Sequence, residues 1–407
     1  MSELRAILHC DLNNFYASCE CLINKELKGK PVAVGGNEED RHGVIVAANY
    51  EAKKFGVRCG VTTYQAKKLC PEIQICQPHF EVYNKYSKLV RNIYEEYTDQ
   101  VEVFSIDECW LDVTHSKIFG NPIKIANEIR ERVKKEIGLT ISVGVSFNKT
   151  FAKIGSDLKK PDATTVITQE NFKQKVWNLP IGYMFGVGRK SQEKLLKLGI
   201  NTIGDLANTD KEFLSKEFGK VGEELYLKAN GLDNDEVGYV TDEVMPKSIG
   251  NSSTFYKDLT TKKEIELAFT VIAESVVERM IKKGIEHART VAIVVRDSDL
   301  KFYQRQTKIQ PCRSSEIFAK TAIKLFYESF SNIKKVRLLG ISVSGFQEEN
   351  QLSMFDSAGN KDVLDEVMLK IRDKFGHNII KRGNALVDEK IAKSMDRVQL
   401  DKLNKDE

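Results

Sequence analysis

The chain has 407 residues, which at roughly 150 residues per domain predicts two to four domains rather than one. A hydrophobic content of 41% with 29% charged residues excludes an intrinsically disordered chain, and a net charge of +4 is too small by itself to indicate a nucleic-acid partner. The eight cysteines include no C-x-x-C pair, and no apolar run approaches the roughly 20 residues that cross a bilayer, so we expect reduced thiols in a cytoplasmic protein with no membrane span.

The chain opens with a predicted strand and helix. The run RAILHCDL reads as a short buried strand, and the residues that follow, with Phe15 and Tyr16 facing inward, form a helix. Asp11 is therefore expected at the end of a strand. Two further short strands are predicted over residues 31–36 and 43–48, and two short helical stretches interrupted by glycines follow them.

A carboxylate pair lies at the centre of the next segment. A helix is predicted over residues 79–98 from apolar and aromatic residues near the 3.6-residue period: Val82, Tyr86, Leu89, Val90, Ile93 and Tyr97. The sequence VEVFSIDECWLDVT then alternates as two β arms, with Asp107 and Glu108 at a hairpin turn or distorted strand position between them. A helix over 122–137, the strand TISVGVSF and a lysine-rich helix complete a ferredoxin-like split sheet.

The rest of the chain predicts two further folding units. Residues 168–232 contain short helices punctuated by glycine, which indicates a separate helical domain. The polar, acidic stretch GLDNDEVGYVTDEVMPK is typical of a linker. A second β-α-β-β-α-β order runs over residues 247–346, and one amphipathic helix is expected near 361–375 in the tail.

The three acidic residues Asp11, Asp107 and Glu108 are candidate metal ligands. Carboxylates on adjacent strand ends can hold two divalent cations about 4 Å apart, which activate an attacking oxygen and stabilise a leaving one. Mg²⁺ needs few protein ligands besides water and phosphate, so these side chains and the backbone carbonyl of Leu12 would suffice. The same residues also suit a structural role, with Asp107 and Glu108 in a solvated turn and Asp11 as a helix N-cap. Spacing alone leaves both interpretations open.

Four motifs in order, DLNNFYASCE, NYEAKKFGV, SIDECWLD and SVGVSFNKTFAKIGSDLKKPD, resemble the Y-family DNA polymerases, especially the DNA polymerase IV group. Weaker similarity continues to about residue 346. The resemblance implies an α+β multidomain fold, a right hand whose parts are a ferredoxin-like palm (1–17 and 78–167), small fingers (18–77), a helix-hairpin-helix thumb (168–232), a linker (233–242), an α/β little finger (243–346) and a tail (347–407). It also implies error-prone DNA synthesis across damaged bases, without a proofreading domain.

The resemblance assigns the carboxylates a catalytic role. It implies that Asp11, Asp107 and Glu108, with the carbonyl of Leu12, hold two Mg²⁺ ions. The primer 3′-oxygen would then attack the α-phosphate of a deoxynucleoside triphosphate in line and release pyrophosphate. Tyr16 matches the aromatic steric gate that collides with a ribose 2′-hydroxyl, and its alternative interpretation is an ordinary core aromatic beside Phe15, which also belongs to the implied nucleotide site.

One tyrosine and two lysines match residues that contact the triphosphate in the family, namely Tyr50, Lys53 and Lys160. Many relatives have arginine where this chain has Lys53, so a point charge replaces bidentate geometry, and a solvated lysine is the alternative interpretation. Asn13 stands where relatives have an acidic residue, and the opening motif resembles the UmuC-like branch, which leaves open whether accessory subunits take part.

Two regions are candidate DNA-binding surfaces. MFGVGRKSQEKLLKLGINTIGDL resembles a helix-hairpin-helix, in which Gly186 and Gly188 would let backbone N–H groups approach a phosphate. Between Arg279 and Arg313 there are nine basic and three acidic residues; the basic ones are Arg279, Lys282, Lys283, Arg289, Arg296, Lys301, Arg305, Lys308 and Arg313. We expect duplex contacts through Arg289, Arg296, Arg305 and Lys308. The alternative is a solvated charged face.

The peptide QLSMF resembles the short segment by which bacterial polymerases bind a sliding clamp. Gln351 would donate and accept hydrogen bonds, while Leu352, Met354 and Phe355 would enter an apolar pocket. Primer–template DNA, deoxynucleotides and the clamp are therefore the expected partners of a monomeric enzyme. Two alternatives are a catalytically silent DNA-damage scaffold and a nucleotidyl cyclase, whose ferredoxin-like core also uses two metals but lacks a thumb, a basic little finger and a clamp peptide.

Overall fold

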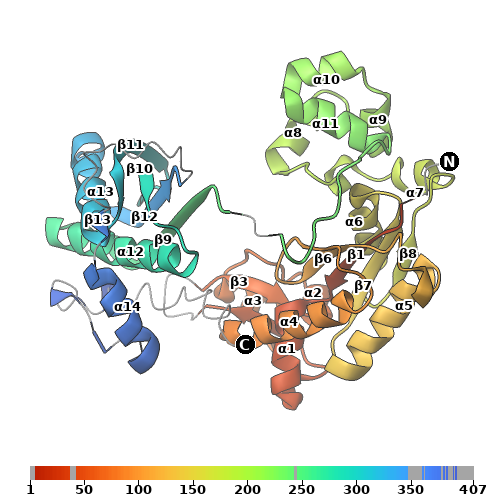
Figure 1. Cartoon of the computed structure of the whole chain (residues 1–407), viewed down its shortest axis with the longest axis horizontal. Helices are drawn as coiled ribbons and strands as arrows, with labels where there is room; N and C mark the ends of the chain where they lie inside the picture. The colour runs from red at the N-terminus through yellow and green to blue at the C-terminus, as the bar shows by residue number, and fades with distance from the viewer. Residues whose placement is uncertain are drawn as a thin grey trace. The chain divides into compact units, whose positions relative to one another are not determined.

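The protein divides into two compact units. The computed structural model describes residues 5–36, 43–242 and 245–346, and beyond these 360–361, 363–376, 379–380, 382–383, 388 and 390–391. The first unit comprises Met1–Gly35 with Val44–Glu243, and the second comprises Gly36–Gly43 with Val244–Glu407 (Figure 1).

A five-stranded sheet forms the centre of the first unit, in the order β5-β6-β1-β7-β8. The strands are β5 (Val101–Val103), β6 (Glu108–Asp112), β1 (Ile7–Leu12), β7 (Ile141–Ser146) and β8 (Thr164–Val166). The central strand β1 is antiparallel to β6 and to β7, and β8 is added parallel to β7. This arrangement confirms the predicted ferredoxin-like order, with β8 as an extra edge strand.

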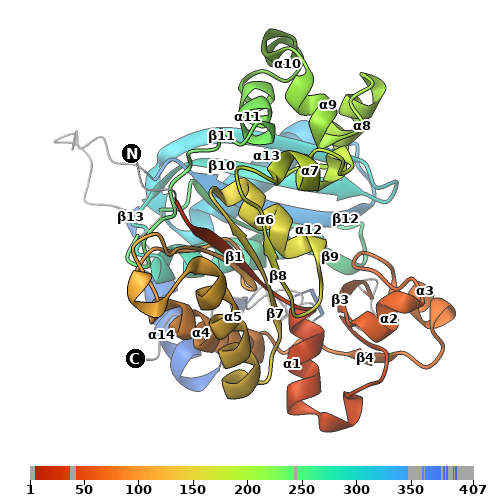
Figure 2. The same ribbon diagram turned by 90° about the vertical axis from the view of Figure 1, so that its right-hand side faces the viewer.

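The two faces of β1 meet different helices. Leu8, Cys10 and Leu12 belong to the core formed with α4 (Phe80–Glu95) and α5 (Pro122–Arg132), which a π-helical turn, Val133–Ile137, extends. On the other face, His9 Nδ1 lies 2.8 Å from the Ser156 hydroxyl of α6 (Lys149–Leu158), and Asp11 also faces this side. Figure 2 shows α5 and α6 on opposite sides of the strands. Because side chains alternate along a strand, Asp11 lies on the α6 side.

Helix α4 shows the predicted period. Val90, Ile93 and Tyr97 are buried as expected, whereas Leu89 is 41% exposed. The helix also turns Tyr83 and Tyr94 inward. The Tyr83 hydroxyl is satisfied inside the fold by the carboxylate of Glu20.

A three-stranded sheet in the order β3-β2-β4 lies beside α1 (Phe15–Ile23). Its elements are β2 (Val32–Gly35), β3 (Ile45–Ala48), α2 (Tyr50–Lys54), α3 (Thr63–Leu69) and β4 (Gln74–Cys76), after a 3₁₀ turn over Lys25–Leu27. The strands β2 and β3 confirm the two predicted ones. Strand β4 was not predicted, because three residues are too few to show an alternating pattern.

Five short helices follow the first sheet, as predicted. They are α7 (Phe172–Val176), α8 (Arg189–Lys197), α9 (Ile203–Asn208), α10 (Lys211–Phe218) and α11 (Lys220–Ala229), with a 3₁₀ turn over Ile181–Tyr183; a further 3₁₀ turn, Lys117–Phe119, precedes α5. Leu195, Ile203 and Leu225 are in their core, which also includes Phe151 and Ile154 of α6. The helical region therefore shares its core with α6.

The start of the predicted linker is packed against the first unit rather than free. Val237 is 2% exposed and lies in a cluster with Ile7 and Trp110. The Asp233 carboxylate accepts hydrogen bonds from the amide and hydroxyl of Thr150, at 3.1 and 2.6 Å. The polar composition that suggested a flexible segment is therefore used partly to satisfy the exposed amides at the N-terminus of α6.

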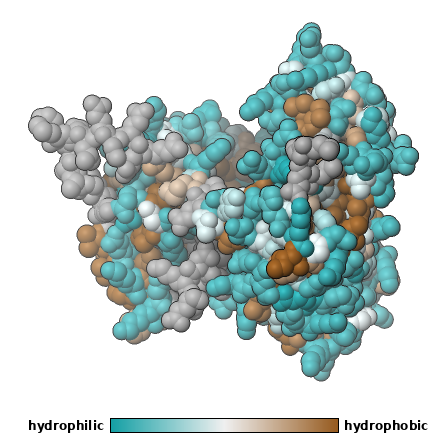
Figure 3. Space-filling view, turned by 45° about the vertical axis from the view of Figure 1, so that its right-hand side comes forward, coloured by the Kyte–Doolittle hydropathy of each residue, from teal (hydrophilic) through white to brown (hydrophobic). Residues whose placement is uncertain are grey.

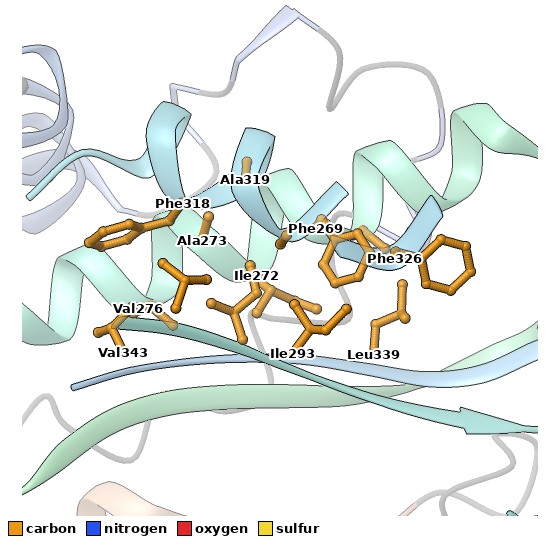
Figure 4. Packing of buried hydrophobic residues seen from close by; sticks show 14 of the residues in the cluster. Phe269, Ile272, Ala273, Val276, Ile293, Phe318, Ala319, Phe326, Leu339 and Val343 are labelled. Carbon is orange, nitrogen blue, oxygen red and sulfur yellow. The ribbon is translucent and has the colours of Figure 1, made fainter. Parts of the chain in front are cut away.

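The second unit has the predicted β-α-β-β-α-β order. Its elements are β9 (Ser248–Leu259), α12 (Lys262–Lys282), β10 (Ala288–Asp297), β11 (Phe302–Arg313), α13 (Ser315–Phe330) and β12 (Val336–Ser344), followed by β13 (Asn360–Lys361) and α14 (Val363–Phe375). The sheet order is β13-β11-β10-β12-β9, so β9 is at an edge, unlike β1 in the first unit. In Figure 4, Phe269 and Ile272 of α12 pack over Ile293 and Leu339 of the sheet.

The face shown in Figure 3 is largely hydrophilic, with apolar groups scattered over it. Among the described residues, no helix is long and apolar enough to cross a bilayer.

Close packing of α6 on β7 depends on Gly144. A Cβ added there would lie 1.8 Å from the Ala152 carbonyl oxygen and 2.6 Å from the Ser156 amide nitrogen. We expect Gly144→Ala to lower the free energy of unfolding by about 3 kcal/mol, because backbone atoms of α6 must move. Urea denaturation followed by circular dichroism measures this. Gly188→Ala, where a Cβ meets nothing within 4 Å, should change it by less than about 1 kcal/mol. Equal stability of both variants would contradict the tight contact.

Candidate active site and DNA-binding residues

The β1–β6 pairing brings the predicted carboxylates together. Asp11 lies opposite Glu108 in the strand register, and the Leu12 amide donates to the Asp107 carbonyl at 3.0 Å. The amides of Phe104 and Ser105 both donate to the Glu108 carbonyl, at 3.0 and 3.2 Å. Asp107 therefore lies in the hairpin connection immediately before β6, one of the two positions that the sequence allowed.

Asp11 is a buried acid with a cationic partner. Its side chain is 8% exposed, and Lys160 Nζ lies 2.7 Å from Oδ2. Burial raises the pKa of Asp11 to about 7, and the neighbouring Glu108 adds to this, while Lys160 acts in the opposite direction. Burial lowers the pKa of Lys160, but Asp11 and Asp157 outweigh it and the pKa is raised overall. Desolvation therefore disfavours the carboxylate more than one ammonium group favours it.

Glu108 has its own lysine partner, which comes from α6. Lys153 Nζ lies 2.7 Å from Glu108 Oε2, and the two side chains are 15% and 18% exposed. The same ammonium group lies 4.8 Å from the ring centre of Phe104 and 5.9 Å from that of Phe185. Asp107 Oδ1 accepts a 2.6 Å hydrogen bond from the Ser105 hydroxyl. Each carboxylate thus has a defined local partner.

The donor set fits a hard divalent cation. Among the described residues, no three His, Cys, Asp or Glu side chains already converge as a metal-binding cluster. Asp11 and Glu108 are nevertheless oxygen donors opposite each other on adjacent strands, with Asp107 next to Glu108 in the hairpin connection. Oxygen ligands of this kind are those that Mg²⁺ prefers.

Asp11 does not cap the helix that follows it, so that interpretation was wrong. The N-cap of α1 is Asn14, whose backbone is left-handed with φ 48° and whose side chain makes no capping hydrogen bond. The Asn14 side-chain oxygen instead accepts from Lys53 Nζ of α2. The helix begins three residues later than a cap at Asp11 requires, and the Asp11 carboxylate accepts a hydrogen bond from Lys160.

Tyr16 lies on α1 beside the carboxylates, against a layer of aromatic rings. It stacks on Tyr83 of α4, with ring centres 4.3 Å apart and planes 13° from parallel. Phe15 is 3% exposed and packs at an angle against both rings. Burial, and after it the Asp107 carboxylate, raises the pKa of Tyr16. The structure therefore brings Tyr16 close to Asp107 while leaving it only partly buried.

The predicted triphosphate residues lie near the same carboxylates. Lys53 Nζ lies 5.0 Å from the ring centre of Tyr50, on α2. Burial and then the positive charge of Lys160 lower the pKa of Lys53. Burial raises the pKa of Tyr50, and Lys160 and Asp11 both act on it. Tyr50, Lys53 and Lys160 are thus close enough to one another and to Asp11 to interact electrostatically.

Asn13 and Asp162 hold the loop that carries Lys160. The buried Asn13 amide donates to the Ser142 hydroxyl at 2.9 Å, and its oxygen accepts from the Asp162 amide at 2.9 Å. Arg130 binds the Asp162 carboxylate at 2.8 Å, and Lys134 binds it at 2.8 Å. The sequence showed that Asn13 stands where relatives have an acidic residue. It could not show the partners of Asn13, because Ser142 and Asp162 are 129 and 149 positions away.

The predicted hairpin of the helical region has an accessible backbone. Gly186 has φ 92°, which favours glycine, and Gly188 is the N-cap residue of α8. A Cβ at Gly188 would meet nothing within 4 Å, and one at Gly186 would meet only Leu225 Cδ2, at 3.7 Å. Neighbouring amides are therefore free of packed side chains at this helix N-terminus.

The basic residues of the second unit divide into two groups. Arg289, Arg305 and Lys308 are exposed on β10 and β11, and Arg296 is half-buried with its guanidinium 5.5 Å from the Phe302 ring centre. Arg313, in contrast, is 5% exposed and pairs with Glu366. Counting Arg313 with the DNA-facing cations was therefore wrong, because it holds α14 to the sheet. The four clamp residues, Gln351, Leu352, Met354 and Phe355, lie outside the described residues.

Comparison with known families and proteins gives a consistent assignment. Residues 10–157 match the impB/mucB/samB family, residues 246–354 match the C-terminal domain of that family, and residues 183–233 match a thumb domain described for DNA polymerase-iota. The matches cover parts of both structural units.

Curated relatives align over nearly the whole chain. DNA polymerase IV of Acetivibrio thermocellus is 47% identical over 393 residues, which cover 94% of this chain and 98% of the relative. DNA polymerase IV 1 of Bacillus subtilis is 37% identical over 393 residues, covering 95% of this chain and 94% of the relative. Among solved structures, a Y-family DNA polymerase chimera, Dbh-Dpo4(243-245)-Dbh, is similar with a TM-score of 0.74 and 25% identity, over 84% of this chain and 99% of that chain.

These matches agree with the sheet orders and with the paired carboxylates on β1 and β6, and they favour neither a silent scaffold nor a cyclase. The chain therefore belongs to the Y family of DNA polymerases, in the DNA polymerase IV group, and is a DNA-directed DNA polymerase of translesion synthesis.

Proposed function

We propose that Asp11, Asp107 and Glu108 are the catalytic carboxylates, and that with the Leu12 carbonyl they hold two Mg²⁺ ions. Y-family polymerases depend on divalent metal, which when bound stabilises the charge of phosphoryl transfer. The observation that carries the proposal is the register pairing of Asp11 with Glu108, next to Asp107 in the same hairpin. Lys160 and Lys153 supply positive charge at two of these carboxylates, Asp11 and Glu108.

Tyr50, Lys53 and Lys160 are proposed to bind the triphosphate of the incoming deoxynucleotide. Lys160 reaches the site from the loop that Asn13 and Asp162 hold, and Lys53 reaches it from α2. Cations on two sides of a phosphate chain orient it and offset the charge that develops there. A lysine offers a point charge without the bidentate geometry of arginine, so orientation rests on the two lysines together.

Tyr16 is proposed as the steric gate, with Phe15 packed behind it at the edge of the nucleotide site. A ring held against the sugar excludes a 2′-hydroxyl by contact, without a hydrogen bond to the base. The support is that Tyr16 remains partly exposed near Asp107 although Phe15 and Tyr83 beside it are buried.

Primer–template DNA is the macromolecular substrate of the enzyme. We propose that the parts of the hand have the predicted bounds: palm 1–17 and 78–167, fingers 18–77, thumb 168–232, linker 233–242, little finger 243–346 and tail 347–407. Gly186 and Gly188 of the thumb would bind phosphate through the backbone, and Arg289, Arg296, Arg305 and Lys308 would neutralise phosphates of the duplex. We further propose a monomer that binds a sliding clamp through Gln351, Leu352, Met354 and Phe355.

The double variant Asp107→Ala, Glu108→Ala tests the catalytic assignment. We expect primer extension with Mg²⁺ to fall by at least about a thousandfold, because the transferred phosphoryl group loses its electrostatic support. Duplex binding, measured by fluorescence anisotropy, should remain close to wild type. Asp112→Asn, at the far end of the same strand β6, serves as the control and should extend normally. Equal extension by the double variant and wild type would overturn the assignment.

The sugar gate gives a second prediction. Tyr16→Ala should admit ribonucleotides, with discrimination against them falling by on the order of 10²-fold, because the contact with the 2′-hydroxyl is lost. Single-nucleotide insertion kinetics with a deoxynucleotide and the matching ribonucleotide measure it. Tyr16→Phe should keep the discrimination, and so should Tyr86→Ala, which removes a half-buried ring from α4. Unchanged sugar selectivity in Tyr16→Ala would rule out the gate.

A further inference from the structure

The ring of Tyr16 is supported by side chains of another helix. Tyr83 lies parallel beneath it at 4.3 Å, and Phe80 meets its edge, with ring centres 6.0 Å apart and planes at 88°. Both supports come from α4, whereas Tyr16 itself belongs to α1. The direction in which the Tyr16 ring faces therefore depends on where Tyr83 is held.

A buried carboxylate holds Tyr83. Tyr83 has no exposed surface, and its hydroxyl donates to Glu20, which is 2% exposed. Glu20 lies one helical turn after Tyr16, on the same side of α1. Burial, and then the hydrogen bond to Glu20, raises the pKa of Tyr83, so the phenol stays a donor. The carboxylate thus connects the helix of Tyr16 to the ring on which Tyr16 stacks.

His79 completes the contact. Its Nδ1 donates to the two Glu20 oxygens at 3.0 and 3.1 Å, because a carboxylate is an acceptor only. His79 is also the N-cap residue of α4, so Glu20 binds both the start of α4 and the tyrosine one turn further along. These two donors, from α4 and from its N-cap, connect α1 to α4 through the Glu20 carboxylate.

Burying a carboxylate is unfavourable, and an apolar side chain would fill the same space at lower energy. An apolar residue, however, cannot accept a hydrogen bond. It would leave the Tyr83 hydroxyl unpaired and would no longer fix the position of the Tyr83 ring. Glu20 has little contact with solvent and lies beneath the aromatic layer, so it acts on the nucleotide site through Tyr83 and Tyr16.

We infer that Glu20 is a positioning residue for sugar selection, which holds the Tyr83–Tyr16 stack and so keeps the Tyr16 ring against the nucleotide sugar. The inference rests on the proposed role of Tyr16 as the gate. It assigns to a buried acid, distinct from the three proposed catalytic carboxylates, a share of the selectivity between deoxyribonucleotides and ribonucleotides.

The test compares kcat/KM for a deoxynucleotide and the matching ribonucleotide in the full-length enzyme. For Glu20→Ala we expect the preference for the deoxynucleotide to fall roughly tenfold, about 1.4 kcal/mol of discrimination. Glu20→Gln should recover most of it, because an amide can still accept from Tyr83. A purely structural role would instead lower kcat/KM for both sugars by the same factor and leave the preference unchanged, which would overturn the inference.

Further variants keep the outcome decisive. Tyr83→Phe retains the ring and removes only the hydroxyl, so it should lose selectivity in the same direction, by roughly threefold, and it decides the question if Glu20→Ala does not fold. Glu128→Ala removes another carboxylate that accepts a hydrogen bond from a tyrosine, Tyr97 at 2.9 Å, and should leave the preference intact.

Tyr16→Ala is measured in parallel. If it lowers the preference while Glu20→Ala and Tyr83→Phe do not, the positioning role is wrong and the gate stands; if it has no effect, the gate itself is wrong.

Discussion

The close contact between α6 and the central sheet is the constraint on which the active site depends. At Gly144 the backbone of α6 comes so near to β7 that no side chain fits between them. This contact brings Lys153 and, just beyond the helix, Lys160 over the face of β1 and β6 that is turned towards α6. Asp11 and Glu108 lie on that face. A larger residue at position 144 would lift the helix and separate the lysines from the carboxylates.

The electrostatics of the site follow from this burial. Asp11 loses more from desolvation than it recovers from Lys160, so its pKa rises to about 7. Additional positive charge near Asp11 would favour its ionised form, because an opposite charge close to a carboxyl group stabilises the carboxylate. The loop fixed by Asn13 and Asp162 carries Lys160, whose ammonium group pairs with the Asp11 carboxylate.

The aromatic layer beside the carboxylates is ordered by polar contacts as well as by packing. Tyr16, Tyr83 and Phe80 fit together as rings, but the Glu20 carboxylate determines which way Tyr83 faces.

A similar use of polar groups occurs in the segment that leaves the helical region. There, Asp233 binds the first turn of α6 and Val237 fills a space next to Trp110, so the chain is held to the first unit for several residues before the second unit begins.

The sequence by itself determined the fold class, the element order of both units and the family, because hydrophobic periodicity and four ordered motifs are local signals. Its errors share one physical cause. The exposure of Leu89, the packing around Val237, the internal role of Arg313 and the cap of α1 all depend on partners far away in the chain. Only the tertiary structure decided that Lys160 meets Asp11 across 149 positions and that Glu20 supports Tyr83 across 63, since a hydrogen bond is set by where folded elements meet.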